Sequence, residues 1–155
     1  MNYYGQYEDL LVERLQMEGV DIAVLPHVDA MNAVRTTTNP QLFVIINGGN
    51  FEEPENLAII AQRETISCEI YIRALSRRGE MGIFDLYEKI SRRLMGYWLP
   101  NAQSAITLNS FGYVAGVQNN WQYALTFSFG HYKVACPDEQ ETGTIKKITN
   151  NVDSL

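Results

Sequence analysis

The chain has 155 residues, of which 46% are hydrophobic and 19% are charged, and its formal net charge is −6. This composition suits one folded domain over residues 1–135 and excludes a disordered chain for that part. The acidic balance argues against free nucleic acid as the main partner, because phosphate binding requires clustered Lys and Arg.

The first half of the chain predicts one helix and two strands before a long loop. Residues 4–17 have apolar side chains at helical spacing, which predicts an amphipathic helix. Asp21–Leu25 predicts a short strand that ends at Pro26. The apolar run Leu42–Ile46 predicts a central strand, and the segment Asn47–Glu55 after it predicts a turn and a loop.

The segment Ala61–Leu75 alternates between apolar and polar residues from Thr65 onward, which is typical of a strand with one buried face. We expect it to pair antiparallel with Leu42–Ile46 across the intervening loop. The buried side would carry Ile66, Cys68, Ile70, Ile72 and Ala74, and the other side Thr65, Ser67, Glu69, Tyr71 and Arg73.

The second half predicts one helix and two further strands. Gly82–Tyr97 combines an apolar stripe with charged residues between its members, as an amphipathic helix does. Ala105–Leu108 predicts a short strand, and the glycine-containing segment Asn109–Asn120 predicts an irregular connection. Trp121–Phe129 alternates again and predicts a strand, whereas residues 136–155 predict a polar, mobile tail.

The expected fold is α+β, with the element order α-β-β-β-α-β-β. Two helices cannot cover both faces of a sheet, so the simplest arrangement is a mixed or antiparallel sheet of about four to five strands with both helices on one face. The other face is half polar and is expected to meet solvent or a neighbouring subunit. Its members would include Glu69, Tyr71, Arg73, Gln122 and Thr126.

No set of residues in the sequence forms a recognisable catalytic, cofactor-binding or metal-binding motif. The two histidines, His27 and His131, have no metal-ligand spacing, and Cys68 falls on the apolar side of a strand, where a thiol is inert. A nucleophile elbow and a phosphate-binding loop are both absent. We therefore expect a protein that is not an enzyme and needs no cofactor. No apolar run reaches the ~18 residues of a membrane span, so no membrane partner is expected.

Charged residues give the best candidates for contact with another protein. Two arginine pairs and two neighbouring glutamates stand out in a chain with 12 Lys and Arg residues. An exposed turn and an exposed helix face are the simpler explanation of the arginine pairs, and the alternative is an interface that docks complementary charge on a neighbour. The candidates for a subunit or partner interface are Arg73, Arg77, Arg78, Arg92, Arg93, Glu52 and Glu53.

The order and spacing of several short motifs resemble the Mu-like phage tail terminator family. The similarity extends over roughly Tyr4 to Val134, and the polar tail lies outside it. The motifs are Ile22–Pro26 after the first helix, the strand Gln62–Ile72, the helix start Gly79 with Gly82–Leu86, the stop Leu94–Pro100 and the strand start Trp121–Tyr123.

That resemblance implies a structural protein of a phage or prophage. Tail terminators have an α+β fold and form a homohexameric ring that caps the tail tube, stops its polymerisation and meets the head-side connector protein. The implied partners are thus other copies of the chain, the tail tube protein and the connector, with no sequence-specific nucleic-acid binding. The implied locations are the host cytoplasm during assembly and then the virion tail.

Two alternatives remain open at the level of the sequence. One is a small-molecule-binding or enzymatic α+β domain, with a pocket between sheet and helices near Tyr71, Tyr87 and Trp98. The other keeps the phage setting and makes the chain a different head–tail joining protein.

Overall fold

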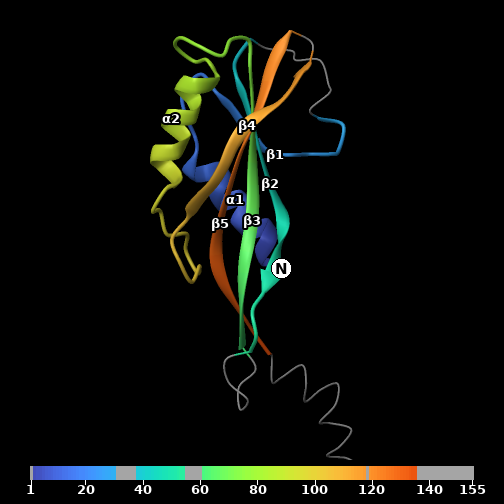
Figure 1. Cartoon of the computed structure of the whole chain (residues 1–155), viewed down its shortest axis with the longest axis vertical. Helices are drawn as coiled ribbons and strands as arrows, with labels where there is room; N and C mark the ends of the chain where they lie inside the picture. The colour runs from blue at the N-terminus through green and yellow to red at the C-terminus, as the bar shows by residue number, and fades with distance from the viewer. Residues whose placement is uncertain (1, 31–37, 55–60, 118, 136–155) are drawn as a thin grey trace, which may run out of the picture.

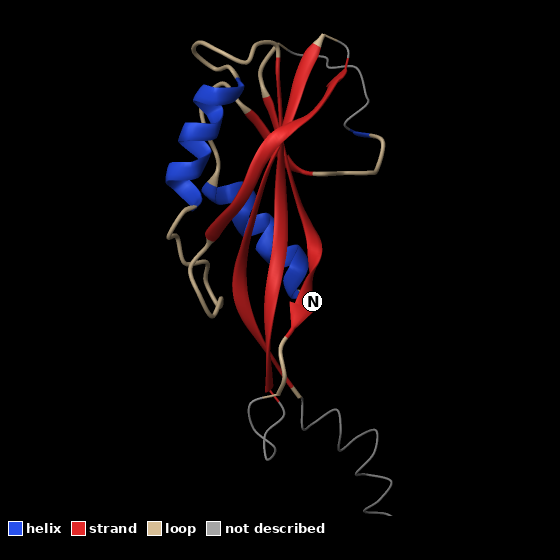
Figure 2. Cartoon of the chain, in the orientation of Figure 1, coloured by secondary structure: helices blue, strands red, loops and turns tan. Residues whose placement is uncertain are grey.

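The computed structural model describes residues 2–30, 38–54, 61–117 and 119–135, which form two helices and five strands in the expected order (Figure 1). The two helices stand to one side of a long, twisted sheet (Figure 2). The elements are α1 Tyr3–Arg14, β1 Asp21–Val24, β2 Gln41–Phe51, β3 Ala61–Ala74, α2 Ile83–Leu94, β4 Thr107–Val117 and β5 Asn120–Val134.

The five strands form one mixed sheet in the order β1-β2-β3-β5-β4. β1 runs parallel to β2, and every other neighbouring pair is antiparallel. The predicted antiparallel pairing of β2 with β3 is confirmed, and so is the α+β class with its element order. β3 and β5 lie inside the sheet and pair along fourteen consecutive positions, from Ala61 opposite Val134 to Ala74 opposite Trp121.

The core lies between one face of the sheet and both helices. The predicted apolar side of β3 is buried from Ile66 to Ala74, and its partners on β5 are buried from Tyr123 to Phe129. α1 packs mainly against β1 and β2, whereas α2 packs against β3, β4 and β5. The helix residues in this single core are Tyr7 and Leu11 of α1 with its C-cap residue Leu15, and Ile83, Leu86, Ile90 and Leu94 of α2.

Three strands are longer than the sequence predicts: β5 runs to Val134 instead of Phe129, and β2 and β4 extend through bulges. β2 continues through Asn47–Asn50, where a turn was expected, because a register shift between Ile46 and Gly48 absorbs one residue while pairing with β3 goes on. β4 occupies most of the expected irregular segment 109–120 and carries two such shifts. Bulges break the alternation that marks a strand, so both extensions look irregular in the sequence.

The sheet face away from the helices is less open than expected. Arg73 is only 1% exposed and Gln122 only 3%, and the two are partners across β3 and β5. Both strands are interior, so Gln41 of β2 flanks Arg73 and Ala115 of β4 flanks Gln122. Arg73 is therefore no surface residue of the chain, which corrects the expectation that this part of the face is free.

The rest of that face is half-buried at Glu69, Tyr71 and Thr126, so a mixed polar surface remains there. No helix in the described part of the chain is long and apolar enough to cross a membrane. The predicted mobile tail, residues 136–155, lies outside the described residues, and the boundary of the single domain at residue 135 stays a prediction.

Candidate association surface

The loop Ser76–Gly82 joins β3 to α2 and places Arg77 beside the helix. The first helical amides need acceptors, and the loop supplies two of them: Ile83 N donates to Ser76 O at 2.9 Å and Phe84 N to Arg77 O at 3.0 Å. A side chain at Gly82 would place its Cβ 2.7 Å from the Arg78 carbonyl oxygen. Glycine at this position thus allows the loop to close tightly onto the helix start.

An aspartate in the first turn of α2 holds the same loop from the other side. Asp85 accepts a hydrogen bond from Met81 N at 2.9 Å and lies 3.2 Å from Lys89 Nζ. The Met81 amide, and then the Lys89 ammonium, lower the pKa of Asp85 below its usual value. Met81 has a φ of 62° and Gly79 a φ of 86°, so the loop turns through left-handed backbone that this carboxylate stabilises.

Arg77 is surrounded by exposed aromatic side chains. Its guanidinium carbon lies 4.9 Å from the ring centroid of Trp121 and 5.9 Å from that of Phe84. Tyr113 of β4 continues the cluster, with its ring 5.9 Å from that of Trp121. The exposed fractions are 39% for Phe84, 58% for Tyr113 and 37% for Trp121. We call Arg77, Phe84, Tyr113 and Trp121 the aromatic–arginine surface.

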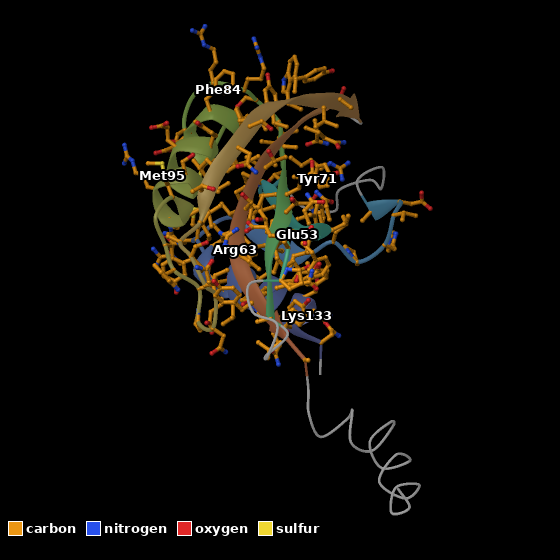
Figure 3. The ribbon with its side chains drawn as sticks, turned by 60° about the horizontal axis from the view of Figure 1, so that its bottom comes forward. Glu53, Arg63, Tyr71, Phe84, Met95 and Lys133 are labelled. Carbon is orange, nitrogen blue, oxygen red and sulfur yellow. The ribbon has the colours of Figure 1, made fainter. Side chains whose placement is uncertain are left out.

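The aromatic–arginine surface lies at the end of the sheet where β3 finishes and β5 begins, and Figure 3 shows Phe84 at this extremity. A shallow pocket of about 310 Å³ adjoins this surface and shares Tyr113 and Trp121 with it. Its other lining residues are Gly116, Asn119 and Asn120. Aromatic residues and arginine are the residue types most enriched where proteins bind proteins. Their gathering on one exposed patch makes this end the best candidate for association.

The two candidate glutamates lie at the opposite end of the sheet. Glu52 and Glu53 follow the end of β2, which pairs with the beginning of β3. Both are exposed, and Glu52 makes an ion pair of 3.1 Å with Arg63. The seven interface candidates predicted from the sequence therefore do not form one site. Arg77 and Arg78 lie at one end of the sheet, and the two glutamates lie at the other.

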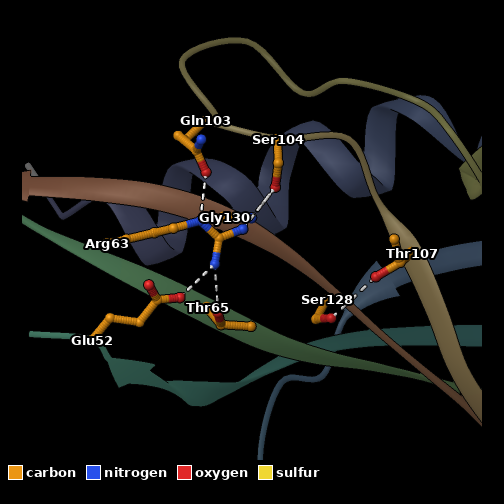
Figure 4. A network of polar contacts seen from close by, with 8 residues as sticks. All are labelled: Glu52, Arg63, Thr65, Gln103, Ser104, Thr107, Ser128 and Gly130. Atoms are coloured by element: carbon orange, nitrogen blue, oxygen red, sulfur yellow. Dashed lines mark hydrogen bonds and ion pairs between the residues drawn. The ribbon is translucent and has the colours of Figure 1, made fainter.

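Arg63 is the centre of a polar network near the glutamates (Figure 4). Its Nε donates to Gln103 Oε1 at 2.7 Å, and its guanidinium also contacts Glu52, Thr65 and Ser104. Ser104 in turn accepts from Gly130 N at 2.8 Å. This network ties the connection between α2 and β4 to the sheet, so Arg63 stabilises the fold of the chain itself.

The candidate arginines of α2 differ from each other. The Arg92 side chain is 81% exposed and reaches Glu88 only at 4.0 Å. Arg93 donates to Gln16 O at 2.5 Å, and its own carbonyl accepts from Arg14 Nε at 2.9 Å. Arg93 therefore links the two helices, and only Arg92 is an open surface charge.

Comparison with known proteins places the chain in a family. Residues 11–152 match the Gp37 protein family, and this match covers nearly the whole chain. The chain belongs to the Gp37 family of phage proteins. No curated protein matches the sequence.

One buried cluster in this Gp37 family member was missed by sequence reasoning. Glu64 is fully buried and accepts hydrogen bonds from the hydroxyls of Tyr3, at 2.7 Å, and of Tyr4. Burial, and then the bond to Glu64, raise the pKa of Tyr4 to about 12 and raise that of Tyr3 as well. A signal was present, since Glu64 lies two residues before Ile66 and hence on the apolar side of β3.

His131 belongs to the same end of the core as Glu64. Its Nδ1 is 2.7 Å from the Tyr7 hydroxyl, and its ring stacks on Tyr3 with 4.3 Å between centroids. Burial lowers the pKa of His131, an effect that Glu64 opposes and Lys133 reinforces. His131 is thus a half-buried histidine that packs against Tyr3 and Tyr7. Among the described residues, no group of three His, Cys, Asp or Glu side chains could hold a metal ion.

Two of the three residues named for the alternative pocket, Tyr71 and Tyr87, lie on different faces of the sheet. Tyr71 lies on the sheet face away from the helices, where its hydroxyl is 3.4 Å from Glu69 Oε1. Tyr87 of α2 packs instead on Phe111 of β4, with 4.2 Å between ring centroids. The alternation of β3 therefore keeps Tyr71 away from Tyr87, and the pocket itself stays a prediction.

Proposed function

We propose that this Gp37 family protein is a tail terminator, a structural rather than catalytic component that closes the end of a phage tail tube as a ring of six copies. The observation that carries the proposal is the aromatic–arginine surface at one end of the sheet. A ring requires each subunit to present two different patches, one to each neighbour. An exposed cluster of aromatic side chains around Arg77 supplies one such patch.

Membership in a phage protein family and the ordered motifs from Ile22–Pro26 to Trp121–Tyr123 support the same function. The partners would be further copies of this chain, the tail tube protein and the head-side connector protein. The protein would assemble in the host cytoplasm and remain in the virion tail. The net charge of −6 suits a ring through which DNA slides, because an acidic wall does not retain phosphates.

A tube-polymerisation assay tests the proposal. Purified tail tube protein is allowed to polymerise with and without this chain, and tube lengths are measured by electron microscopy. A terminator shortens the tubes in proportion to its concentration and is found at one tube end only. Binding to the connector with no effect on tube length would identify a head–tail joining protein instead.

A further inference from the structure

The outermost strand, β4, has a long open edge. β4 is the last strand in the sheet and pairs only with β5 among the described strands. It is 11 residues long, which corresponds to an edge of about 36 Å at the usual rise of a strand. Asn109, Ser110, Gly112, Tyr113 and Val114 are all exposed along it.

This edge lacks most of the features that protect sheet edges from pairing. Thr107–Val117 contains no charged residue and no proline. By contrast β1, at the other side of the sheet, has only four residues, begins with Asp21 and is followed by Pro26. Natural proteins shield exposed edges with charges, prolines or short strands, because unpaired backbone groups bind further strands. Two bulges twist β4, and they are the only such device it carries within the described residues.

The opposite edge of the sheet, where β1 and β2 lie, offers a second open stretch. β1 covers β2 only from Gln41 to Val44, so the later part of β2 has no strand on that side among the described residues. The Glu8 carboxylate of α1 accepts a hydrogen bond from Ile46 N at 2.9 Å, just beyond the stretch of β2 that pairs with β1. The segment Asn47–Phe51 beyond it is uncharged, contains two glycines and exposes Phe51 by 51%.

The two stretches complement each other. Both are uncharged, so neither repels the other, and both offer backbone donors and acceptors. They lie toward opposite edges of one sheet, so each copy could offer a different patch to each of its two neighbours. Tyr113 belongs both to β4 and to the aromatic–arginine surface, so a strand added at β4 also covers exposed aromatic area.

We propose that the sheet continues from one copy of the chain to the next, with β4 of one copy pairing along Asn47–Phe51 of its neighbour. This proposal rests on the ring proposed above and names the contact that builds it. Backbone hydrogen bonds supply the affinity, as in other cases of strand addition, and the aromatic–arginine surface supplies buried area beside them.

The test compares Val114→Lys with Val28→Lys. Val114 is 48% exposed and lies at a bulge of β4, between the paired residues Tyr113 and Ala115, so a charge there blocks the edge with little effect on the subunit. Val28 is 88% exposed and outside every strand, which makes it the matched control. Assembly is measured by light scattering over a concentration series with and without tail tube, and folding by thermal melting.

We expect Val114→Lys to need at least tenfold more protein for assembly than wild type or Val28→Lys. Hydrogen exchange on assembled wild type should slow at the amides of Thr107–Val117 and Asn47–Phe51, which tests the contact without any substitution. Assembly of Val114→Lys at the wild-type concentration, with no slowing in β4, would overturn the edge contact and leave the ring intact. Wild type that never assembles, even on the tube, would contradict the ring and the contact together.

Discussion

Glu64 is the residue whose place in the core depends most on its neighbours. A buried carboxylate is costly unless its oxygens accept hydrogen bonds, and the hydroxyls of Tyr3 and Tyr4 provide them. Gly49 of β2 makes the space, because a Cβ there would lie 2.7 Å from Glu64 Cγ and 2.8 Å from Cδ. The cluster thereby fastens the start of α1 to the end of β2 and the start of β3.

Gly49→Ala should lower the free energy of unfolding by about 1–3 kcal/mol, the range expected when a buried polar group loses its partners. The new methyl group would displace Glu64 from the tyrosine hydroxyls. Urea unfolding measures the change. Gly112→Ala is the matched control in another strand, since a Cβ there meets nothing within 4 Å. Equal stability of the two variants would show that Glu64 adjusts without loss.

His131 should make stability depend on pH. Its pKa is lowered by burial in the folded state, so below the ordinary value of ~6.5 the unfolded chain binds a proton more readily. The stabilisation is complete above that pH and is lost as the pH falls through the lower, folded pKa. Urea unfolding between pH 5 and 8 should show a smaller loss for His131→Asn than for wild type. The exposed His27→Asn should behave as wild type, and a matching change in both variants would contradict the assignment.

At the scale of elements, the sequence predicts those whose pattern is regular. β3 alternates without interruption from Thr65, and its buried side matches the expectation residue by residue. β2 and β4 were predicted too short because bulges and glycines interrupt the alternation, and only pairing with a neighbouring strand reveals that they continue. The buried state of Arg73 has the same origin, since burial on an interior strand depends on neighbours far away in the sequence.

The candidate site was predictable in part for the same reason. Arg77 and Arg78 are conspicuous as a pair in a glycine-bounded loop, and the structure confirms that both are exposed. The aromatic surroundings of Arg77 come from α2, β4 and β5, which the chain order does not bring together. The register of β3 with β5 places Trp121 opposite Ala74, three residues before Arg77.

Arg93→Glu and Arg92→Glu should separate the two roles of the α2 arginines. Arg93→Glu should lower the free energy of unfolding by about 1–2 kcal/mol, because it removes a charged donor to the Gln16 carbonyl. Arg92→Glu should change it by less than about 0.5 kcal/mol, since an exposed ion pair contributes little. Urea unfolding of the two variants measures both values, and equal losses would mean that Arg93 does not hold the helices together.

At the scale of the whole molecule, the long sheet separates two unlike ends. One end carries Arg77 among exposed aromatic rings, and the other carries Glu52 and Glu53 near the Arg63 network. The helices cover one face only, and β4 leaves one side of the sheet open. A subunit with unlike surfaces is suited to head-to-tail contact with copies of itself.

Arg77→Glu should weaken assembly strongly while leaving the subunit folded. The substitution loses the contacts with Trp121 and Phe84, worth about 0.5–1 kcal/mol each at an exposed site, and places a carboxylate in the proposed interface. Light scattering and thermal melting together measure the two effects. Arg92→Glu is the matched charge reversal on α2. If only that variant impaired assembly, the helix rather than the aromatic–arginine surface would be the interface.

The mass of the wild-type protein in solution tests the central claim most directly. Light scattering across a concentration series, alone and with purified tail tube, gives the number of copies in the assembly. The proposed ring predicts a mass six times that of the chain at high concentration or on the tube. A monomer under all these conditions, with no binding to the tube, would contradict it.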